Sequence, residues 1–380
     1  MDKRVYLLTA IAFVVGMVEL IIGGILDLVA SDLGVSVGRA GLLITFFALV
    51  FAISGPVLLF LTGKTDRKIV TLSALFVFFI GNIIAIFSTT YSILLLSRIV
   101  SASSGALLVV LCLTLASHIS KPEYHGRAIG LVIMGISGSV VLGLPIGVSL
   151  GHALGWRSPF IVVAILTIAL VLGVYLFFGK ITTQPPMSLK KQLEALNDQK
   201  VLFGQLTTFF FLAGHFTLYG YLTPFVKTTM GFDGTLITIV YFVYGAAAVA
   251  GGGLGGVSAD HFGVRRTLLT VIVLLGICLL IMPFAPNWLF WIVLVIWGVL
   301  SWAITPPVQS HLIQLASDTA DIQQSLNNAA LHLGIAFGTF VGSIVADRWS
   351  VEQNSFIGVL FVVMALAAAL FSLQREREIA

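Results

Sequence analysis

Twelve apolar segments, separated by short polar ones, run through the whole chain. Most hold about 20 to 28 residues, and a helix of about 20 residues crosses the ~30 Å hydrocarbon core of a bilayer. Open sheets cannot pair all their backbone groups in lipid, so the pattern predicts twelve transmembrane helices. The first segment is too long for a signal peptide and lacks a clear cleavage site, so we expect it to remain. The segments cover residues 5–29, 39–62, 69–89, 92–117, 127–151, 159–179, 201–226, 234–258, 267–285, 287–315, 323–346 and 353–373.

The longest polar segment, 179–200, separates the sixth predicted helix from the seventh. Its Pro185-Pro186 pair breaks a helix, and the following "SLKKQLEALNDQK" predicts a short amphipathic helix on the inner membrane surface. We therefore expect an N-terminal six-helix bundle at 1–179, a cytoplasmic linker at 180–200 and a C-terminal six-helix bundle at 201–380.

The two halves repeat a stripe of small residues at every fourth position. Such a stripe lets another helix backbone approach closely. Its return at half the chain length predicts two pseudo-symmetric bundles related by an axis along the membrane normal, an architecture common in transporters. The stripe of the fifth helix is Gly135, Ser139, Gly143, Gly147 and Gly151, and that of the eleventh is Ala330, Gly334, Gly338, Gly342 and Ala346.

Composition and charge support an all-α integral membrane fold. Hydrophobic residues make up 58% of the chain and charged residues only 9%, against about 25% charged residues in soluble domains. With the N-terminus placed in the cytoplasm, fifteen of the 20 Lys and Arg residues fall on the inner side. This asymmetry predicts that both termini are cytoplasmic. The net charge of +4 therefore reflects membrane topology, and we expect no nucleic-acid partner.

Metal and disulfide chemistry find no support in the sequence. Cys112 and Cys278 both lie inside predicted helices, where free cysteines usually serve as packing residues. No clustered Cys/His spacing suggests a zinc site. We expect neither a metal nor a cofactor.

Glu19 and Arg98 are charged residues deep within predicted helices. At ~1.5 Å per residue, both lie about 12–15 Å below the outer membrane surface. The helix face of Glu19 carries Ala12, Gly16 and Gly23, so it suits the bundle interior better than lipid. A charge at the helix centre costs roughly 2.5–3.5 kcal/mol and usually marks a transport pathway.

A carboxyl group removed from water exchanges its proton closer to neutral pH. We therefore expect Glu19 and Arg98 to couple proton movement to a change of access, with Asp27 as a weaker third member. The alternative is a structural Glu19–Arg98 pair that only holds two helices together.

Polar and aromatic side chains of the second half form the expected substrate site. Rings can stack on a flat solute, and amides and imidazole can bond to its edge. The alternatives are aromatic anchoring at the lipid interface for the tryptophans and helix bridging for the amides. The candidates are His215, Tyr219, Trp297, Trp302, Gln309, Asn327 and Asn328.

The loop "GGVSADHFGVRR" resembles the cytoplasmic loop motif of the major facilitator superfamily. This resemblance implies a major facilitator fold of two six-helix bundles and a cytoplasmic gate. In the second half the gate residues are Asp260, Arg265 and Arg266. The first-half copy, "LTGKTDRK", departs from the motif, with Gly63 where the Asp belongs and Asp66 where the second Gly belongs. Its basic part is kept by Lys64, Arg67 and Lys68.

Other motifs narrow the resemblance to the drug:proton antiporter-1 family. "GMVELIIGGILDLVASDLGVS" is similar to its first-helix motif, with Asp27 in place of the usual proline. "SRIVSASSGALLVV" resembles its fourth-helix motif, and "GSVVLGLPIGVSLGHALGWR" its fifth-helix antiporter motif, with Gly143, Pro145 and Gly147. "LAGHFTLYGYLTPFV", "GVLSWAITPPVQSHLI" and "SDTADIQQSLNNAALHLGIAFG" resemble the purine-base and nucleoside efflux pumps of that family.

The resemblance implies a monomeric, multi-pass exporter in the inner membrane of a bacterium, driven by a proton gradient. Purine bases or nucleosides are the expected substrates, and multidrug or sugar efflux is the alternative. An integral-membrane enzyme would need clustered acids or histidines at one membrane face. A receptor would need a large loop or an added domain. A channel fits the halved sequence with its one deep acid less well than a carrier does.

Overall fold

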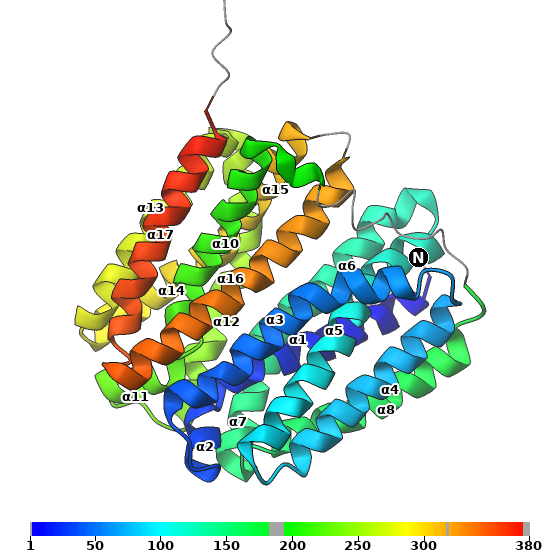
Figure 1. The fold of residues 1–380 in the computed structure, drawn as a ribbon, viewed down its shortest axis with the longest axis horizontal. Coiled ribbons are helices and arrows are strands. Elements are labelled where there is room, and N and C mark those ends of the chain that lie inside the picture. The colour runs from blue at the N-terminus through cyan, green and yellow to red at the C-terminus, as the bar shows by residue number, and fades with distance from the viewer. Residues whose placement is uncertain (1, 182–193, 317–318, 375–380) are drawn as a thin grey trace, which may run out of the picture. The chain divides into compact units, whose positions relative to one another are not determined.

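The computed structural model describes residues 2–181, 194–316 and 319–374 (Figure 1). In these ranges, 12 helices are long and apolar enough to cross a membrane, which confirms the predicted number. Residues 188–193 of the predicted amphipathic linker helix lie outside the described ranges. In the described remainder, Ala195–Asn197 forms a single 3-10 turn and the seventh span begins at Gln199. The helices that form the spans and their extensions are α1 (Arg4–Gly24), α2 (Leu26–Asp32), α3 (Val37–Leu61), α4 (Arg67–Ile86), α5 (Tyr91–Ile119), α6 (His125–Gly138), α7 (Leu144–Leu154), α8 (Ser158–Phe177), α10 (Gln199–Tyr219), α11 (Leu222–Met230), α12 (Thr235–Phe262), α13 (Val264–Ile281), α14 (Asn287–Ala303), α15 (Thr305–Leu315), α16 (Ala320–Arg348) and α17 (Gln353–Ser372).

Two segments predicted as continuous helices, 5–29 and 201–226, are broken in the structure. Ile25, with φ −120° and ψ 19°, separates α1 from α2, and Tyr221, with φ −118° and ψ 20°, precedes α11. The first break directly follows the Gly23-Gly24 pair, and glycine is a weak helix former. The second lies three residues before Pro224, whose ring disfavours a helix continuing through from upstream.

The fifth span contains a π-helical turn, Ser139–Gly143, between α6 and α7. Pro145 lies two residues after the end of this turn. Proline has no N–H and its ring clashes with the carbonyl one turn earlier, so a wider turn relieves the local geometry. The tenth span breaks at Ile304, just before the Pro306-Pro307 pair.

Packing divides the chain into two units. The first comprises Met1–Met187 and Tyr221–Gly245, and the second comprises Ser188–Gly220 and Ala246–Ala380. The second-half segment 221–245, which holds α11 and the start of α12, therefore groups with the first-half helices.

In the first unit, α1 packs against α6 and α7 through the predicted small-residue stripe. A Cβ added at Gly135 would lie 2.3 Å from the main-chain oxygen of Thr9, and one at Gly147 would lie 2.1 Å from the Ile21 side chain. At Gly135 the neighbouring atom is main chain and leaves no space for a larger residue, whereas at Gly147 the Ile21 side chain would have to shift. The prediction that this stripe allows close helix approach is confirmed.

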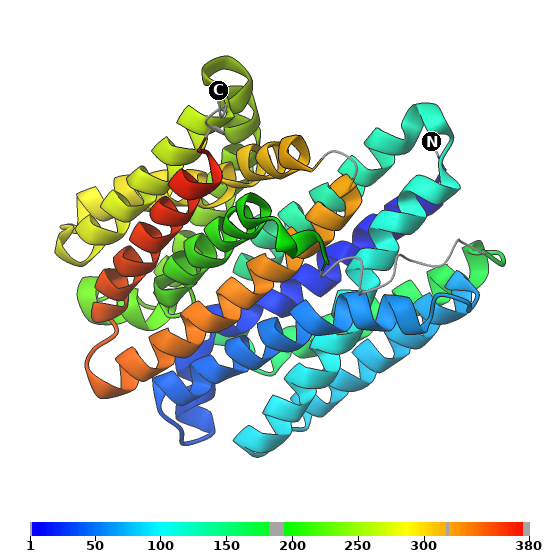
Figure 2. The ribbon, with the colours of Figure 1, turned by 45° about the horizontal axis from the view of Figure 1, so that its top comes forward.

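In the second unit, α10 packs between α16 and α17 (Figure 1, Figure 2). The eleventh-helix stripe again lies at the contact, because a Cβ at Gly338 would lie 2.2 Å from the Ala213 carbonyl oxygen. On the other side of α10, Gly214 and Gly358 face each other at similarly short range. The repeated stripe therefore has the same packing role in both units.

Candidate functional site

Arg98 is 0% exposed within the first unit. Its Nη1 donates to the Val18 carbonyl at 2.9 Å and its Nη2 to the Glu19 carbonyl at 3.3 Å. Its guanidinium carbon lies 4.0 Å from the centre of the Phe47 ring. Nε has no hydrogen-bond partner among the described residues. Arg98 thus links α5 to α1 and α3 and keeps one N–H group to spare.

Glu19 lies half-buried on α1, beside this guanidinium. Its negative charge acts on Arg98, while the hydrogen bonds of Arg98 go to main-chain oxygens. The first and fourth spans therefore contact each other at these two residues. Their role in proton coupling stays a prediction.

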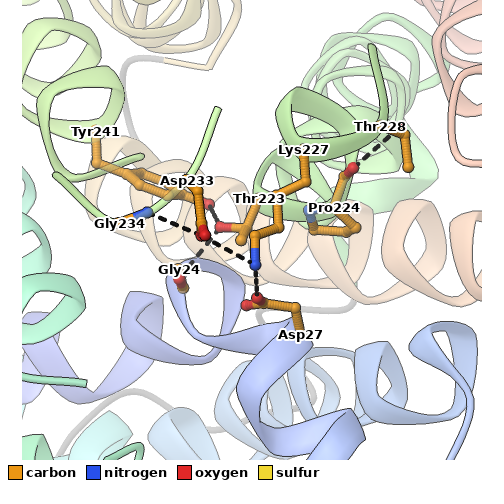
Figure 3. Close-up of polar contacts among 9 residues, drawn as sticks. All are labelled: Gly24, Asp27, Thr223, Pro224, Lys227, Thr228, Asp233, Gly234 and Tyr241. Carbon is orange, nitrogen blue, oxygen red and sulfur yellow. Dashed lines mark hydrogen bonds and ion pairs between the residues drawn. The ribbon is translucent and has the colours of Figure 1, made fainter. Parts of the chain in front are cut away.

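Asp27 has a different partner. It lies on α2, beyond the break in the first span, and its Oδ2 accepts from Lys227 Nζ at 2.7 Å (Figure 3). Lys227 is also 3.2 Å from Asp233 Oδ1. No pattern in the sequence connects Lys227 with Asp27, although Lys227 is one of the few basic residues predicted on the outer side.

Two hydroxyl groups contact the end of α1 beside this ion pair. Tyr241 donates to the Gly23 carbonyl at 3.0 Å and Thr223 to the Gly24 carbonyl at 3.2 Å. The two hydroxyl oxygens are 3.0 Å apart, and Figure 3 draws their contact as a dashed line. They bond to carbonyl groups next to the helix break.

The charges around Lys227 act on one another. Burial lowers the pKa of Lys227, but its hydrogen bond and attraction to Asp27, followed by those to Asp233, raise it above the ordinary value overall. The Gly234 N–H and then Lys227 hold the pKa of Asp233 below its usual range. Both pKa shifts favour the charged forms of Lys227 and Asp233.

His215, Tyr219 and Trp297 meet inside the second unit; we call them the aromatic cluster. Trp297 Nε1 donates to His215 Nδ1 at 2.9 Å. The His215 and Tyr219 rings stack with centroids 5.0 Å apart, and the Trp297 and Tyr219 rings meet edge to face at 6.0 Å. Trp297 is 0% exposed, which excludes the lipid-interface alternative for this residue. The bond to Nδ1 means that a neutral imidazole carries its proton on Nε2.

Asn327 belongs to a second group, the amide network. Its Nδ2 donates to Gln205 Oε1 at 3.1 Å and to Thr208 Oγ1 at 2.7 Å. Gln205 in turn donates to Gln323 Oε1 at 3.1 Å. These bonds join α10 to α16, as in the helix-bridging alternative. Gln205 and Thr208 were missed, although their spacing of three residues places both on one side of a helix.

Three other candidates lie outside both groups. Trp302 and Gln309 are partly exposed, and Asn328 is exposed beside the buried Asn327. Adjacent helix residues point in directions about 100° apart, so Asn328 does not share the contact made by Asn327. In the described part of the chain, none of the three bonds to either group.

The first-half gate loop is tied to the end of the sixth span. Asp66 accepts from the N–H groups of Lys68 at 2.9 Å and Ile181 at 3.1 Å. Arg67 is buried and donates to the Thr62 carbonyl at 3.3 Å, whereas Lys64 is exposed. Asp66 therefore caps α4 and fixes the chain near residue 181.

The second-half gate residues, Asp260, Arg265 and Arg266, are exposed at the junction of α12 and α13. Gly263 has φ 83°, a backbone conformation that favours glycine. Within the residues that the structure describes, the three charged side chains form no ion pair with one another. Their role as a gate stays a prediction.

The fifth-helix motif lies against α1. A Cβ at Gly143 would be 3.2 Å from Met17, and Pro145 is buried in α7. Among the described residues, no group of three or more His, Cys, Asp or Glu side chains has a geometry that holds a metal ion.

Comparison with known proteins gives consistent matches. The Major Facilitator Superfamily model matches residues 8–321 and 206–379. The uncharacterized MFS-type transporter YbcL of Bacillus subtilis (strain 168) is 33% identical over 371 residues, 97% of this chain and 95% of that protein. A probable sugar efflux transporter of Helicobacter pylori (strain P12) is 27% identical, over 96% of this chain and 93% of its own length. The crystal structure of a bacterial homolog to the human lysosomal transporter Spinster superposes with a TM-score of 0.79 at 17% identity, covering 98% of each chain.

Proposed function

Since this chain belongs to the major facilitator superfamily, we propose that it is a proton-coupled exporter of purine bases or nucleosides. The family and the relatives are membrane transporters of small molecules and not enzymes. The proposal adds the substrate, the direction and the driving ion, and it assigns the protein to the antiporter branch that its motifs resemble. It also places a monomer in the bacterial inner membrane, without a cofactor.

The aromatic cluster is the observation that carries the substrate proposal. It places two rings and an imidazole in contact within one helical unit. Stacking on such rings contributes about 1–3 kcal/mol per base in nucleic-acid sites. The cluster and the amide network contain no acidic or basic side chain with a fixed charge, which suits a neutral solute with hydrogen-bonding edges.

Glu19 and Arg98 support the proton-coupling proposal. Glu19 is half-buried next to a guanidinium that already bonds to two carbonyl groups of α1. Protonation of Glu19 would cancel its attraction to Arg98 and leave those carbonyl bonds in place. The contact between Glu19 and Arg98 can therefore carry two different charges without losing its hydrogen bonds. Each charge state can favour either the inward-facing or the outward-facing conformation.

Sugar efflux is the second candidate. The relative from Helicobacter pylori is described as a probable sugar efflux transporter. Amide and hydroxyl groups such as those of Gln205, Thr208 and Asn327 also suit the hydroxyl groups of a sugar. The two candidates differ in whether the rings of the aromatic cluster are needed for binding.

Proteoliposomes with an imposed pH gradient test the proposal. The protein should move labelled hypoxanthine, adenine or guanosine, and proton flux should depend on the solute. Export of a labelled sugar alone would favour the second candidate, and export of a cationic dye alone would favour multidrug efflux.

Glu19→Gln should abolish gradient-driven export while counterflow of the same solute continues. The exposed loop acid Glu123 offers the matched control, because Glu123→Gln removes a carboxylate outside the apolar spans. Full gradient-driven export by Glu19→Gln would refute the coupling role.

Trp297→Phe keeps a ring but removes the N–H that bonds to His215, so it should shift the preference among purines.

A further inference from the structure

Lys227 lies between two carboxylates that come from different parts of the chain. Its Nζ is 2.7 Å from Asp27 on α2 and 3.2 Å from Asp233, which follows α11 (Figure 3). The side chain of Asp27 is 16% exposed, that of Lys227 32%, and that of Asp233 77%. The inner ion pair is therefore partly desolvated, and the outer one is close to a surface pair. We call Asp27, Lys227 and Asp233 the outer latch.

The negative charge of the Asp27 carboxylate is balanced by Lys227. Its second oxygen, Oδ1, is buried without a hydrogen-bond partner in the described part of the chain. Removal of one partner of a buried pair leaves an uncompensated charge, which costs more than the loss of an exposed pair. Asp27 stands where the first-helix motif that this segment resembles usually has a proline.

The latch is part of a wider contact between segment 221–245 and the first-half helices. Tyr241 and Thr223 bond to carbonyl groups at the end of α1. The Tyr221 side chain lies on Gly41 of α3, where a Cβ would clash with its hydroxyl. Tyrosine and threonine contacts of this kind have no net charge, whereas the latch contributes a charge interaction at the edge of the same contact.

We propose that Lys227 is a positioning residue of the transport cycle: it holds segment 221–245 against α1 and α2 through Asp27 and releases that carboxylate when the segment moves away. The proposal rests on the alternating access assumed in the proposed function but not on the identity of the solute. A purely structural pair would change the stability of the protein without changing the exposure of the segment.

The exposure of Val226 in α11 measures this release directly, because its side chain is 0% exposed. A single cysteine at this position, Val226→Cys, is placed in a Cys112→Ser/Cys278→Ser background and labelled with a membrane-impermeant maleimide. Lys227→Ala and Asp27→Asn should each raise the labelling rate about fivefold, the change that loss of one ion pair of about 1 kcal/mol produces. The exchanged pair Asp27→Lys/Lys227→Asp, combined with Asp233→Asn so that no second carboxylate faces the exchanged one, should return the rate to within about twofold of the Asp233→Asn protein.

Asp32 and Arg157 provide the matched control. They form a 2.9 Å ion pair within the first-half helices, so Arg157→Ala should leave the labelling of Val226→Cys unchanged. Equal effects of Arg157→Ala and Lys227→Ala, or no effect of Lys227→Ala, would overturn the proposal.

A reversible cross-link tests whether the latch must open during transport. Cysteines at positions 27 and 227, joined by a short reducible bis-thiosulfonate, should stop export, and reduction should restore the rate measured before cross-linking. Full export by the cross-linked protein would refute the need for release. Labelling of Val226→Cys requires no solute, so a failure of the latch is distinguishable from a wrong substrate.

Discussion

At the residue scale, Asp32 shows how one carboxylate organises the end of a helix. Its Oδ2 accepts from Trp156 Nε1 and from Arg157 Nη1, both at 2.9 Å. Arg157 continues to the Ser88 carbonyl at 2.7 Å through its other nitrogen. One acid thus joins the ends of three spans through charge-assisted hydrogen bonds, which are stronger than neutral ones.

This arrangement predicts a pH-dependent change at Trp156. The hydrogen bond from Trp156, and then the bond and charge of Arg157, hold the pKa of Asp32 below its ordinary value of 3.8. Since the folded-state pKa is lowered, the contribution of this contact is present above pH 3.8 and is lost as the pH falls through the lowered value. Tryptophan fluorescence should therefore show a transition below pH 3.8 that is missing in Asp32→Asn. A transition that persists in that variant would contradict the assignment.

Site residues were easier to predict than their partners. Glu19 and Arg98 stand out because charges within apolar helices are costly in any fold. The acceptors of Arg98 are main-chain carbonyls, which every residue carries, so side-chain identities do not reveal them. Lys227 was missed for another reason: it is about 200 positions from Asp27, and no local pattern joins them.

At the element scale, close packing depends on single glycines. The stripe on α16 brings Gly338 against the Ala213 carbonyl, and the stripe on α6 brings Gly135 against that of Thr9. Without a hydrophobic driving force between helices in lipid, such van der Waals contacts carry much of the association energy. The period of four made these stripes predictable. The breaks at Ile25 and Tyr221 were not predicted, because the hydropathy of the two segments does not mark an interruption. The Gly23-Gly24 pair and Pro224 were the sequence signals that could have shown them.

Gly338→Ala should therefore destabilise the second unit. The added Cβ would lie 2.2 Å from a main-chain oxygen that cannot rotate away, and overpacking of this kind typically costs about 1–3 kcal/mol. Gly253 on α12 is the control, since a Cβ there has nothing within 4 Å. Gly253→Ala should be neutral or stabilising by up to ~1 kcal/mol through helix propensity. Thermal unfolding in detergent measures both, and equal midpoints for the two variants would contradict the packing argument.

At the scale of the whole molecule, hydropathy and charge carry different information. Hydropathy gave the number of spans, because each must be apolar over its full length to cross lipid. Charge predicts the direction of insertion, through the excess of Lys and Arg expected on the inner side. The grouping of segment 221–245 with the first unit follows from neither. It depends on contacts between particular residues, such as the hydrogen bond from Tyr241 to the Gly23 carbonyl. A hydropathy value averaged over many residues does not reveal such contacts.

The charge asymmetry predicts that both termini and the α12–α13 junction face the cytoplasm and that the loop before α17 faces outward. Fifteen of the 20 Lys and Arg residues lie on the inner side in this orientation, and reversing it would move them across the membrane against the insertion preference.

His261 and Gln353 are exposed at the two predicted faces. In the background lacking Cys112 and Cys278, an impermeant maleimide should label Gln353→Cys in intact cells but His261→Cys only after permeabilisation. A C-terminal alkaline phosphatase fusion should likewise be inactive, because that enzyme needs an oxidising compartment for its disulfides. Labelling of His261→Cys in intact cells, together with an active fusion, would mean that the chain inserts the other way round.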